Sequence, residues 1–286
     1  MKKEIDIEVK EEVLSLVTDI TYSCVPDWYG AVYTDLKMNL IIPKHRENHK
    51  KQPLIIWICG GAYSVVSNTA WMPELMYFAR AGFVIASVEY RTSNKGAFPA
   101  GLIDVKSAIR FLKAHAEEFC IDVNNIYVMG ESAGATYSVL AGTTAHVKKW
   151  DRGYYLEYDS SVQGVVDFYG PVDFSEMCVK KNDEVPGWVL TAFLGEDKEK
   201  ENKMEASPIN YITENTVPML ILHGIDDVTV PISQSDLLYE KLVEKNIETE
   251  YYRFKHAGHG EDVFYQENVK EIILDFLNRQ IEKHTV

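Results

Sequence analysis

The sequence predicts an α/β fold of three layers, in which helices cover both faces of a mainly parallel central sheet. Apolar runs without alternation are typical of strands that are buried on both faces. Helical patterns separate these runs, and alternating strands and helices indicate right-handed crossovers with parallel pairing. The five runs are Leu54–Ile58, Phe83–Val88, Ile126–Met129, Val162–Phe168 and Met219–Leu222.

Two further strands are expected near the N-terminus, at 18–24 and 36–43. In the second, Leu36, Met38 and Leu40 alternate with Lys37 and Asn39. Alternation of this kind favours a half-exposed strand. We therefore expect an antiparallel N-terminal edge on the sheet.

Two helices show clear amphipathic spacing. Apolar residues recur at intervals of three and four from Phe98 to Leu112, and again from Val269 to Leu277. This spacing places the apolar side chains on one helical face. Both helices are expected to pack on the sheet.

We expect one domain over residues 1–286, because this length suits a single large α/β unit and no linker or internal repeat is present. One stretch interrupts the strand-helix alternation, at about 171–208. It is too long for a simple turn and mixes aromatic with charged residues. We interpret it as a small cap or lid insertion over the strand ends; the alternative is a satellite helix packed away from the site.

Charge restricts the expected partners. Acidic residues outnumber basic ones by 43 to 29, and the formal net charge is −14 at pH 7. Nucleic acid and anionic membrane surfaces both require clustered basic charge, so neither is expected as a partner. Acidic residues follow Lys2 and Lys3 where a signal peptide has its apolar region, and no run is long enough to span a membrane. We therefore expect a cytoplasmic protein of unknown oligomeric state.

The four cysteines do not suggest a metal site or a disulfide framework. Cys24, Cys59, Cys120 and Cys178 lie far apart, and no Cys-x-x-Cys is present. Buried thiols are expected, and no metal ligand set is predicted.

The pentapeptide Gly130-Glu131-Ser132-Ala133-Gly134 carries the main chemical signal. It lies between a short apolar run and a small-residue stretch that favours a helix. Gly-x-Ser-x-Gly at a strand-to-helix turn is typical of a nucleophile elbow, which leaves the serine exposed above the sheet edge. Ser132 is therefore the predicted nucleophile.

A serine hydroxyl needs a base to take its proton and a carboxylate to orient that base. Candidates follow two downstream strands in the order acid, then base: Asp226 and Asp227 after 217–222, and His256 and His259 after 249–254. The spacing His-Gly-x-x-Asp-x-x-Val-Pro favours Asp227, and the flanking glycines favour His259. His223 is expected to be a satisfied core residue, and His256 a structural one.

An oxyanion requires hydrogen-bond donors that are already in place. The elbow supplies the backbone N–H of Ala133, and a second donor is expected from the loop after an early strand. That loop reads Cys59-Gly60-Gly61-Ala62-Tyr63. Gly61 and Ala62 are both candidates.

Together these motifs resemble the α/β-hydrolase superfamily, and within it the carboxylesterases of the hormone-sensitive-lipase and feruloyl or acetyl-xylan esterase (BD-FAE-like) type. The resemblance implies the α/β-hydrolase fold and covers about residues 53–260. One departure concerns the family's usual His-Gly-Gly-Gly, since this chain has Cys59-Gly60-Gly61-Ala62. Loss of the histidine alters how the loop is anchored, although the backbone donors remain. The matching segments are 59–63, 88–91, 98–99 with Asp104, 130–134, 223–231 and 256–260.

Four aromatic residues lie, in sequence, near loops that are expected at the site: Tyr63, Trp71, Trp188 and Phe193. They could line an acyl or aryl pocket or stack on a sugar ring. Aromatic side chains are also typical core residues. Trp188, in the expected cap, is the favoured contact residue.

The sequence thus predicts a serine ester hydrolase that forms an acyl-enzyme and requires no metal or organic cofactor. The expected substrates are small esters, such as acetylated or feruloylated saccharides. Two alternatives remain open. A serine aminopeptidase or dipeptidyl-peptidase-like enzyme shares the triad, although it usually carries a further domain that gates entry. Some α/β-hydrolase folds are non-catalytic ligand receptors, typically after losing a triad residue.

Overall fold

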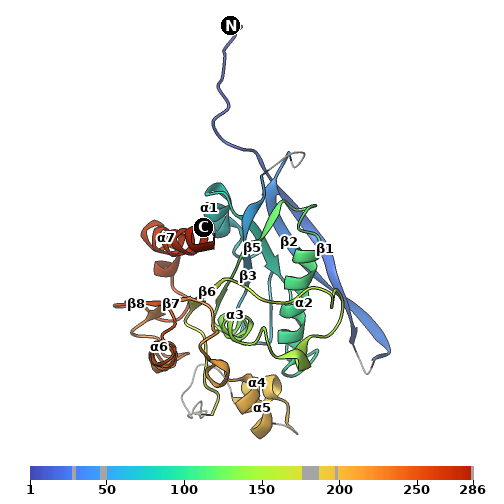
Figure 1. The fold of residues 1–286 in the computed structure, drawn as a ribbon, viewed down its shortest axis with the longest axis vertical. Helices are drawn as coiled ribbons and strands as arrows, with labels where there is room; N and C mark the ends of the chain where they lie inside the picture. Colours follow the sequence, from blue (N-terminus) through green and yellow to red (C-terminus); the bar gives the residue numbers. More distant parts are fainter. Residues whose placement is uncertain (28–29, 46–49, 176–186, 197–198, 285–286) are drawn as a thin grey trace.

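The computed structural model describes residues 1–27, 30–45, 50–175, 187–196 and 199–284. Its central sheet has eight strands in the order β1-β2-β4-β3-β5-β6-β7-β8 (Figure 1). The strands are β1 (Leu14–Asp27), β2 (Val32–Pro43), β3 (Gln52–Ile58), β4 (Val84–Val88), β5 (Ile121–Glu131), β6 (Gly164–Phe168), β7 (Met219–Gly224) and β8 (Thr249–Phe254).

The pairing confirms a mainly parallel sheet with an antiparallel N-terminal edge. β1 pairs with β2, and β2 with β4, in antiparallel register, while the strands from β4 through β8 pair in parallel. The predicted strand at 36–43 is not the outermost one, because β1 covers it. Asn39 is therefore buried, and its side chain accepts the N–H of Asp19 and donates to the carbonyl of Asn68, each at 3.0 Å.

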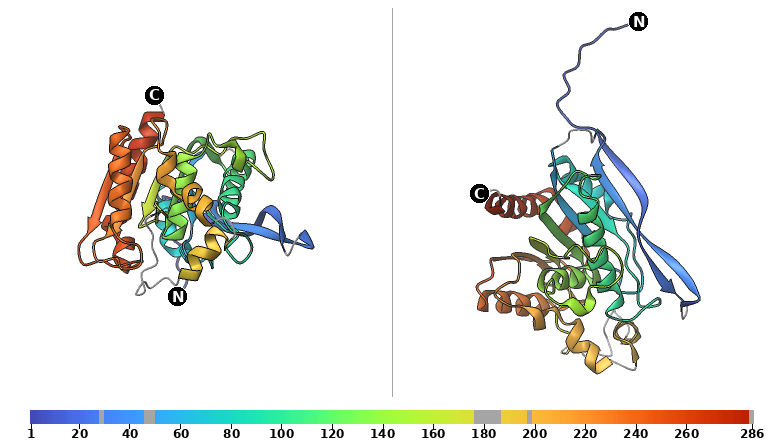
Figure 2. Two further views of the ribbon diagram at one scale, coloured as in Figure 1. Left: turned by 90° about the horizontal axis from the view of Figure 1, so that it is seen from below. Right: turned by 45° about the vertical axis from the view of Figure 1, so that its right-hand side comes forward.

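Helices cover both faces of the sheet, which confirms the three layers (Figures 1 and 2). α2, α3 and α6 contribute buried side chains to one face, and α1 and α7 to the other. The long helices are α1 (Met72–Arg80), α2 (Ala100–Ala114), α3 (Ala133–Thr143), α6 (Ser233–Glu244) and α7 (Glu267–His284). Among the described helices, none is both long and apolar enough to cross a membrane.

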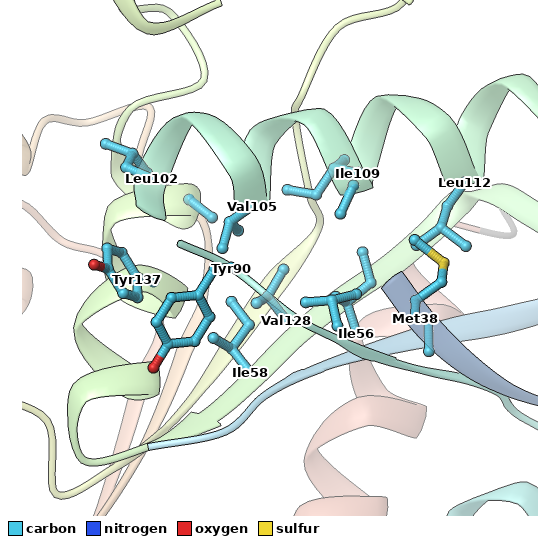
Figure 3. Close-up of a cluster of buried hydrophobic side chains, with 14 of the residues drawn as sticks. Met38, Ile56, Ile58, Tyr90, Leu102, Val105, Ile109, Leu112, Val128 and Tyr137 are labelled. Carbon is cyan, nitrogen blue, oxygen red and sulfur yellow. The ribbon is translucent and has the colours of Figure 1, made fainter. Parts of the chain in front are cut away.

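The continuous apolar runs are explained by this double burial. On β3, Ile56 and Ile58 point toward α2, and the alternate residues Ile55 and Trp57 pack on the side of α1 and α7. Figure 3 shows the α2 side, where one face of the helix lies over the sheet. A strand that is buried on both faces has no polar side to alternate with.

The predicted insertion at 171–208 lies only partly within the described residues, since 176–186 and 197–198 lie outside them. The described part contains α4 (Gly187–Leu194) and α5 (Glu199–Ala206). The N–H of Phe98, near the start of α2, donates to the carbonyl of Phe193 at 2.7 Å. Asn202 on α5 donates to the carbonyl of Leu194. That this segment forms a cap on a single domain stays a prediction.

Candidate active site

Ser132 lies in a sharp turn between the end of β5 and the first residue of α3. Its backbone has φ 53° and ψ −122°, a strained conformation for a residue with a side chain. Its N–H donates to the carbonyl of Phe168 on the neighbouring strand at 2.9 Å. The turn therefore raises the hydroxyl at the carboxyl edge of the sheet, as a nucleophile elbow does.

Gly134 allows this turn to approach the end of β3. A Cβ atom at this position would lie 2.0 Å from the carbonyl oxygen of Ile58. Only glycine avoids that contact. The close approach brings the loop that follows β3, at residues 59–63, beside Ser132.

Two further strand ends bring a histidine and a carboxylate to the serine. The Oγ of Ser132 lies 2.9 Å from Nε2 of His259, and Nδ1 of His259 lies 2.7 Å from Oδ2 of Asp227. The His259 ring also packs against the Tyr169 ring in a T-shaped arrangement, with the ring centroids 4.7 Å apart. Because the carboxyl ends of parallel strands share one edge of the sheet, residues far apart in sequence meet here.

Asp227 is held as an ionised carboxylate. Its Oδ1 accepts the backbone N–H groups of Thr229 and Val230, at 2.9 and 2.8 Å. Burial alone would raise the pKa of this carboxyl, but hydrogen bonds from His223 and His259 outweigh it and lower the pKa to about 2. The group therefore stays charged at neutral pH.

The geometry distinguishes between the sequence candidates. The side chain of Asp226 is 61% exposed, and its nearest basic partner is His256, at 3.9 Å from Oδ2. His256 itself is 94% exposed, so the expectation of a structural role at the strand end is wrong. His223 is fully buried and hydrogen-bonded, as expected for a core histidine.

The loop after β3 has three successive residues with positive φ. Gly61, Ala62 and Tyr63 have φ values of 125°, 51° and 59°. The carbonyl of Gly61 accepts the N–H groups of Ser64 and Val65, so it is directed into the turn. Ala133 is the first residue of α3, where N–H groups have no intrahelical partner.

Glu131 anchors this loop, a role that sequence reasoning missed. Its Oε1 accepts the N–H of Gly60 at 2.6 Å and lies 3.6 Å from the Sγ of Cys59. The hydroxyl of Tyr90 donates to the carbonyl of Cys59 at 2.9 Å. Burial raises the pKa of the Glu131 carboxyl, and the N–H of Gly60 partly offsets this rise. The available signal was its place beside the serine in Gly-x-Ser-x-Gly.

The four predicted contact aromatics differ in their environments. Tyr63 and Phe193 stack on each other in the core, with ring centroids 3.8 Å apart, rather than at a surface that a substrate reaches. Trp71 stacks on Tyr265 at 4.2 Å. Trp188 is 64% exposed and borders an open hollow of about 470 Å³ beside α4. Substrate contact thus stays a prediction, with Trp188 the accessible candidate.

Comparisons with known proteins point to one group. The BD-FAE family model matches residues 38–242. Esterase LipC of Mycobacterium tuberculosis is 31% identical over 218 residues, which are 75% of this chain and 54% of that protein. The chain thus spans about half the length of the curated relatives it matches.

Solved structures give a similar result. A truncated carbohydrate esterase from gut microbiota is 28% identical, with a TM-score of 0.78 over 93% of this chain and 96% of that one. An acetyl ester-xyloside bifunctional hydrolase from Caldicellulosiruptor lactoaceticus is 25% identical, with a TM-score of 0.73 over 90% of this chain and 95% of that one. The fold is therefore that of α/β-hydrolase esterases.

Proposed function

The chain belongs to the BD-FAE family, and on this basis we propose that it is a carboxylic ester hydrolase in which Ser132 is the nucleophile. The observation that carries the proposal is the continuous hydrogen-bonded series from Ser132 through His259 to Asp227. That arrangement has the geometry by which a serine hydroxyl is activated.

In the proposed reaction, Nε2 of His259 takes the proton of Ser132 as its Oγ attacks the ester carbonyl. The carboxylate of Asp227 holds the proton on Nδ1, so that Nε2 is free to accept, and stabilises the imidazolium that forms. His259 then protonates the departing alcohol. Water attacks the acyl-enzyme by the same route and releases the acid.

The negative charge on the carbonyl oxygen would be stabilised by backbone N–H groups. We assign this role to Ala133, together with Gly61 or Ala62. Losing one such donor typically reduces the rate by about 100- to 1000-fold. The anchoring of the loop by Glu131 supports this assignment because preformed donors require no reorganisation during the reaction.

We propose small esters as substrates, with acetylated or feruloylated saccharides as the favoured class. Two similar structures support this choice, one of a carbohydrate esterase and the other of an acetyl ester-xyloside bifunctional hydrolase. An exposed tryptophan such as Trp188 suits stacking on a sugar ring. A panel of acyl lengths and sugar esters would define the preference.

The test is hydrolysis of p-nitrophenyl acetate by the wild type and by Ser132→Ala. We expect kcat of the variant to be more than about 1000-fold lower than that of the wild type. A fluorophosphonate probe should label the wild type only. Ser161→Ala is the matched control, because Ser161 precedes β6 at the opposite edge of the sheet. Full activity in Ser132→Ala would exclude the proposed nucleophile.

The two alternatives have distinct outcomes in the same assay. Faster turnover of aminoacyl-p-nitroanilides than of the acetate ester would indicate a serine aminopeptidase. Absence of both turnover and probe labelling would indicate a ligand receptor. The hydrogen bonds of the triad favour the hydrolase over the receptor.

A further inference from the structure

A second histidine contacts the same carboxylate oxygen as His259. His223, at the end of β7, is fully buried, and its Nε2 lies 3.2 Å from Oδ2 of Asp227 and 2.9 Å from the carbonyl oxygen of Val230. Its Nδ1 lies 2.7 Å from the hydroxyl of Ser235, near the start of α6. Oδ2 of Asp227 therefore lies between two imidazole rings.

These partners determine where the proton of His223 lies. A carbonyl and a carboxylate only accept hydrogen bonds, so Nε2 must carry a hydrogen and share it between Val230 and Asp227. In the neutral ring Nδ1 is then an acceptor, and the buried hydroxyl of Ser235 is suited to donate to it. The result is a directed series of donors from Ser235 through His223 to Asp227.

We propose that His223 is a positioning residue that acts on the reaction through Asp227, by fixing the carboxylate and partly neutralising its charge. This inference rests on the proposed function, in which Asp227 orients His259. Thr229 and Val230 donate to Oδ1, and Oδ2 lies 2.7 Å from Nδ1 of His259 and 3.2 Å from Nε2 of His223. The carboxylate therefore cannot rotate without losing a buried polar contact.

The donor from His223 also has an electrostatic consequence. It compensates part of the negative charge that faces His259, so the imidazolium form of His259 is less stabilised than beside a carboxylate without this donor. Removing the donor should move the acidic limb of the kcat/KM profile to higher pH. A residue that only filled space would lower kcat without moving this limb.

Other titratable groups face this pair and must be controlled. Asp167 on β6 interacts electrostatically with His223, and Glu131 on β5 with His259. The Tyr169 ring lies against both histidines. Asp167 is the group to control first because burial raises its pKa to about 7, inside the range of the profile. The comparison is therefore repeated in an Asp167→Asn background.

The experiment compares His223→Phe with His223→Gln by pH profiles of p-nitrophenyl acetate hydrolysis. For the Phe variant we expect about a tenfold loss of kcat with little change in KM, and an acidic limb displaced upward by about half a pH unit. The Gln amide can still donate to Asp227, so its limb should stay near that of the wild type. His256→Gln, which replaces an exposed histidine, is the matched control.

A second measurement does not depend on turnover. The His259 Nδ1 proton, in its 2.7 Å hydrogen bond, should give a far-downfield NMR resonance that is lost in His259→Gln. We expect this resonance to move further downfield in His223→Phe and to be restored in His223→Gln. If the Phe variant does not fold, Ser235→Ala replaces it, and a smaller shift of the acidic limb and the resonance in the same directions is expected.

The outcomes separate this inference from the proposed function. Equal losses of kcat in the Phe and Gln variants, with no movement of the limb or the resonance, would show that His223 only packs. An unmoved limb and resonance in Ser235→Ala would also overturn the proposal if the Phe variant cannot be studied. A wild type without esterase activity would reject the proposed function, and the resonance would still decide whether His223 donates to Asp227.

Discussion

The backbone N–H of Gly60 donates to the carboxylate of Glu131 at 2.6 Å, which ties the residue beside Ser132 to the loop that carries Gly61 and Ala62. This close approach requires glycine, because a Cβ atom at position 60 would lie 2.5 Å from Oε2 of Glu131. This loop lacks the histidine that begins the usual His-Gly-Gly-Gly. In this chain Glu131 ties the elbow to the loop, and the hydroxyl of Tyr90 holds the same loop through the carbonyl of Cys59.

Replacing Glu131 should separate its hydrogen bond from its charge. In Glu131→Ala the loop loses its anchor, and we expect kcat for p-nitrophenyl acetate to fall about 100-fold with little change in KM. Glu131→Gln keeps a carbonyl acceptor for Gly60 and should lose much less. Equal losses in both variants would show that the charge, rather than the anchor, matters.

The pH profile of Glu131→Gln provides a second check. The carboxylate of Glu131 interacts favourably with protonated His259, so removing its charge should destabilise the imidazolium. The acidic limb of kcat/KM should then move to lower pH, the opposite of the shift expected for His223→Phe. A limb that moved upward would contradict this electrostatic assignment.

Asp227→Asn should strongly reduce kcat and have only a small effect on the free energy of unfolding. Oδ1 accepts two backbone N–H groups, so the Asn oxygen is expected there and its NH₂ would face His259. An NH₂ at this place forces the wrong tautomer on the base, which typically costs about 10⁴-fold in kcat. Steady-state kinetics at pH 8 would measure the loss.

Asp226→Asn is the control for this substitution, because the neighbouring carboxylate is exposed and pairs with His256. Its kcat should stay within about twofold of the wild type. If Asp226→Asn instead lost activity and Asp227→Asn retained it, the acid of the triad would be misassigned.

Much of this fold could be predicted from the sequence, because its signals are local. Double burial of the strands produced apolar runs, and alternation in 36–43 predicted an antiparallel N-terminal edge, although β1 rather than this strand is outermost. The residues that meet at Ser132 were predictable because each follows a strand, and parallel strands end at one edge. Order along the chain indicated two candidates for each role, and the spacing after His223 and the glycines beside His259 favoured Asp227 and His259.

The remaining features depend on side-chain direction, which no local pattern encodes. Tyr63 follows the glycines of the loop, yet its hydroxyl bonds Thr136 at 2.7 Å and its ring stacks on Phe193 in the core. The contact of Glu131 with Gly60 spans 71 residues. Such pairings are determined by tertiary packing, so the contacts of Glu131 and His223 emerged only from the structure.

Two aromatic residues on α4 should respond differently to truncation. Phe193 is 1% exposed and packs against Tyr63, so Phe193→Ala should destabilise the protein by about 3–5 kcal/mol. Trp188 is 64% exposed, and Trp188→Ala should change stability by less than about 0.5 kcal/mol. Urea unfolding would measure both.

Trp188→Ala also tests substrate contact. Trp188→Ala should raise KM for acetylated xylo-oligosaccharides and leave p-nitrophenyl acetate hydrolysis unchanged, since only the sugar needs a stacking surface. An unchanged KM for the sugar ester would remove Trp188 from the predicted contact residues. A destabilised Trp188→Ala variant would place its side chain in the packing of α4.

Asp167 should make stability depend on pH. It is fully buried on β6, its Oδ1 accepts the N–H of Gly170 at 2.9 Å, and its Oδ2 has no partner among the described residues. Burial raises its pKa to about 7, compared with about 3.9 in an unfolded chain. The folded protein therefore keeps this proton to a higher pH than the unfolded chain does.

The sign of the effect follows from this difference in proton binding. As pH rises from about 4 to 7, the wild type loses folding free energy on account of Asp167, in total about 4 kcal/mol for a shift of about three pH units. Asn has no titrating proton, so Asp167→Asn does not lose this free energy as pH rises. The free energy of unfolding of the variant relative to the wild type should therefore increase over this window and level off above about pH 7. Urea unfolding at pH 4.5, 6 and 8 would measure the trend. Asp226→Asn removes an exposed carboxylate, so its free energy of unfolding should follow that of the wild type at each pH. If the difference between Asp167→Asn and the wild type were also independent of pH, Asp167 would be ionised at low pH in the folded state.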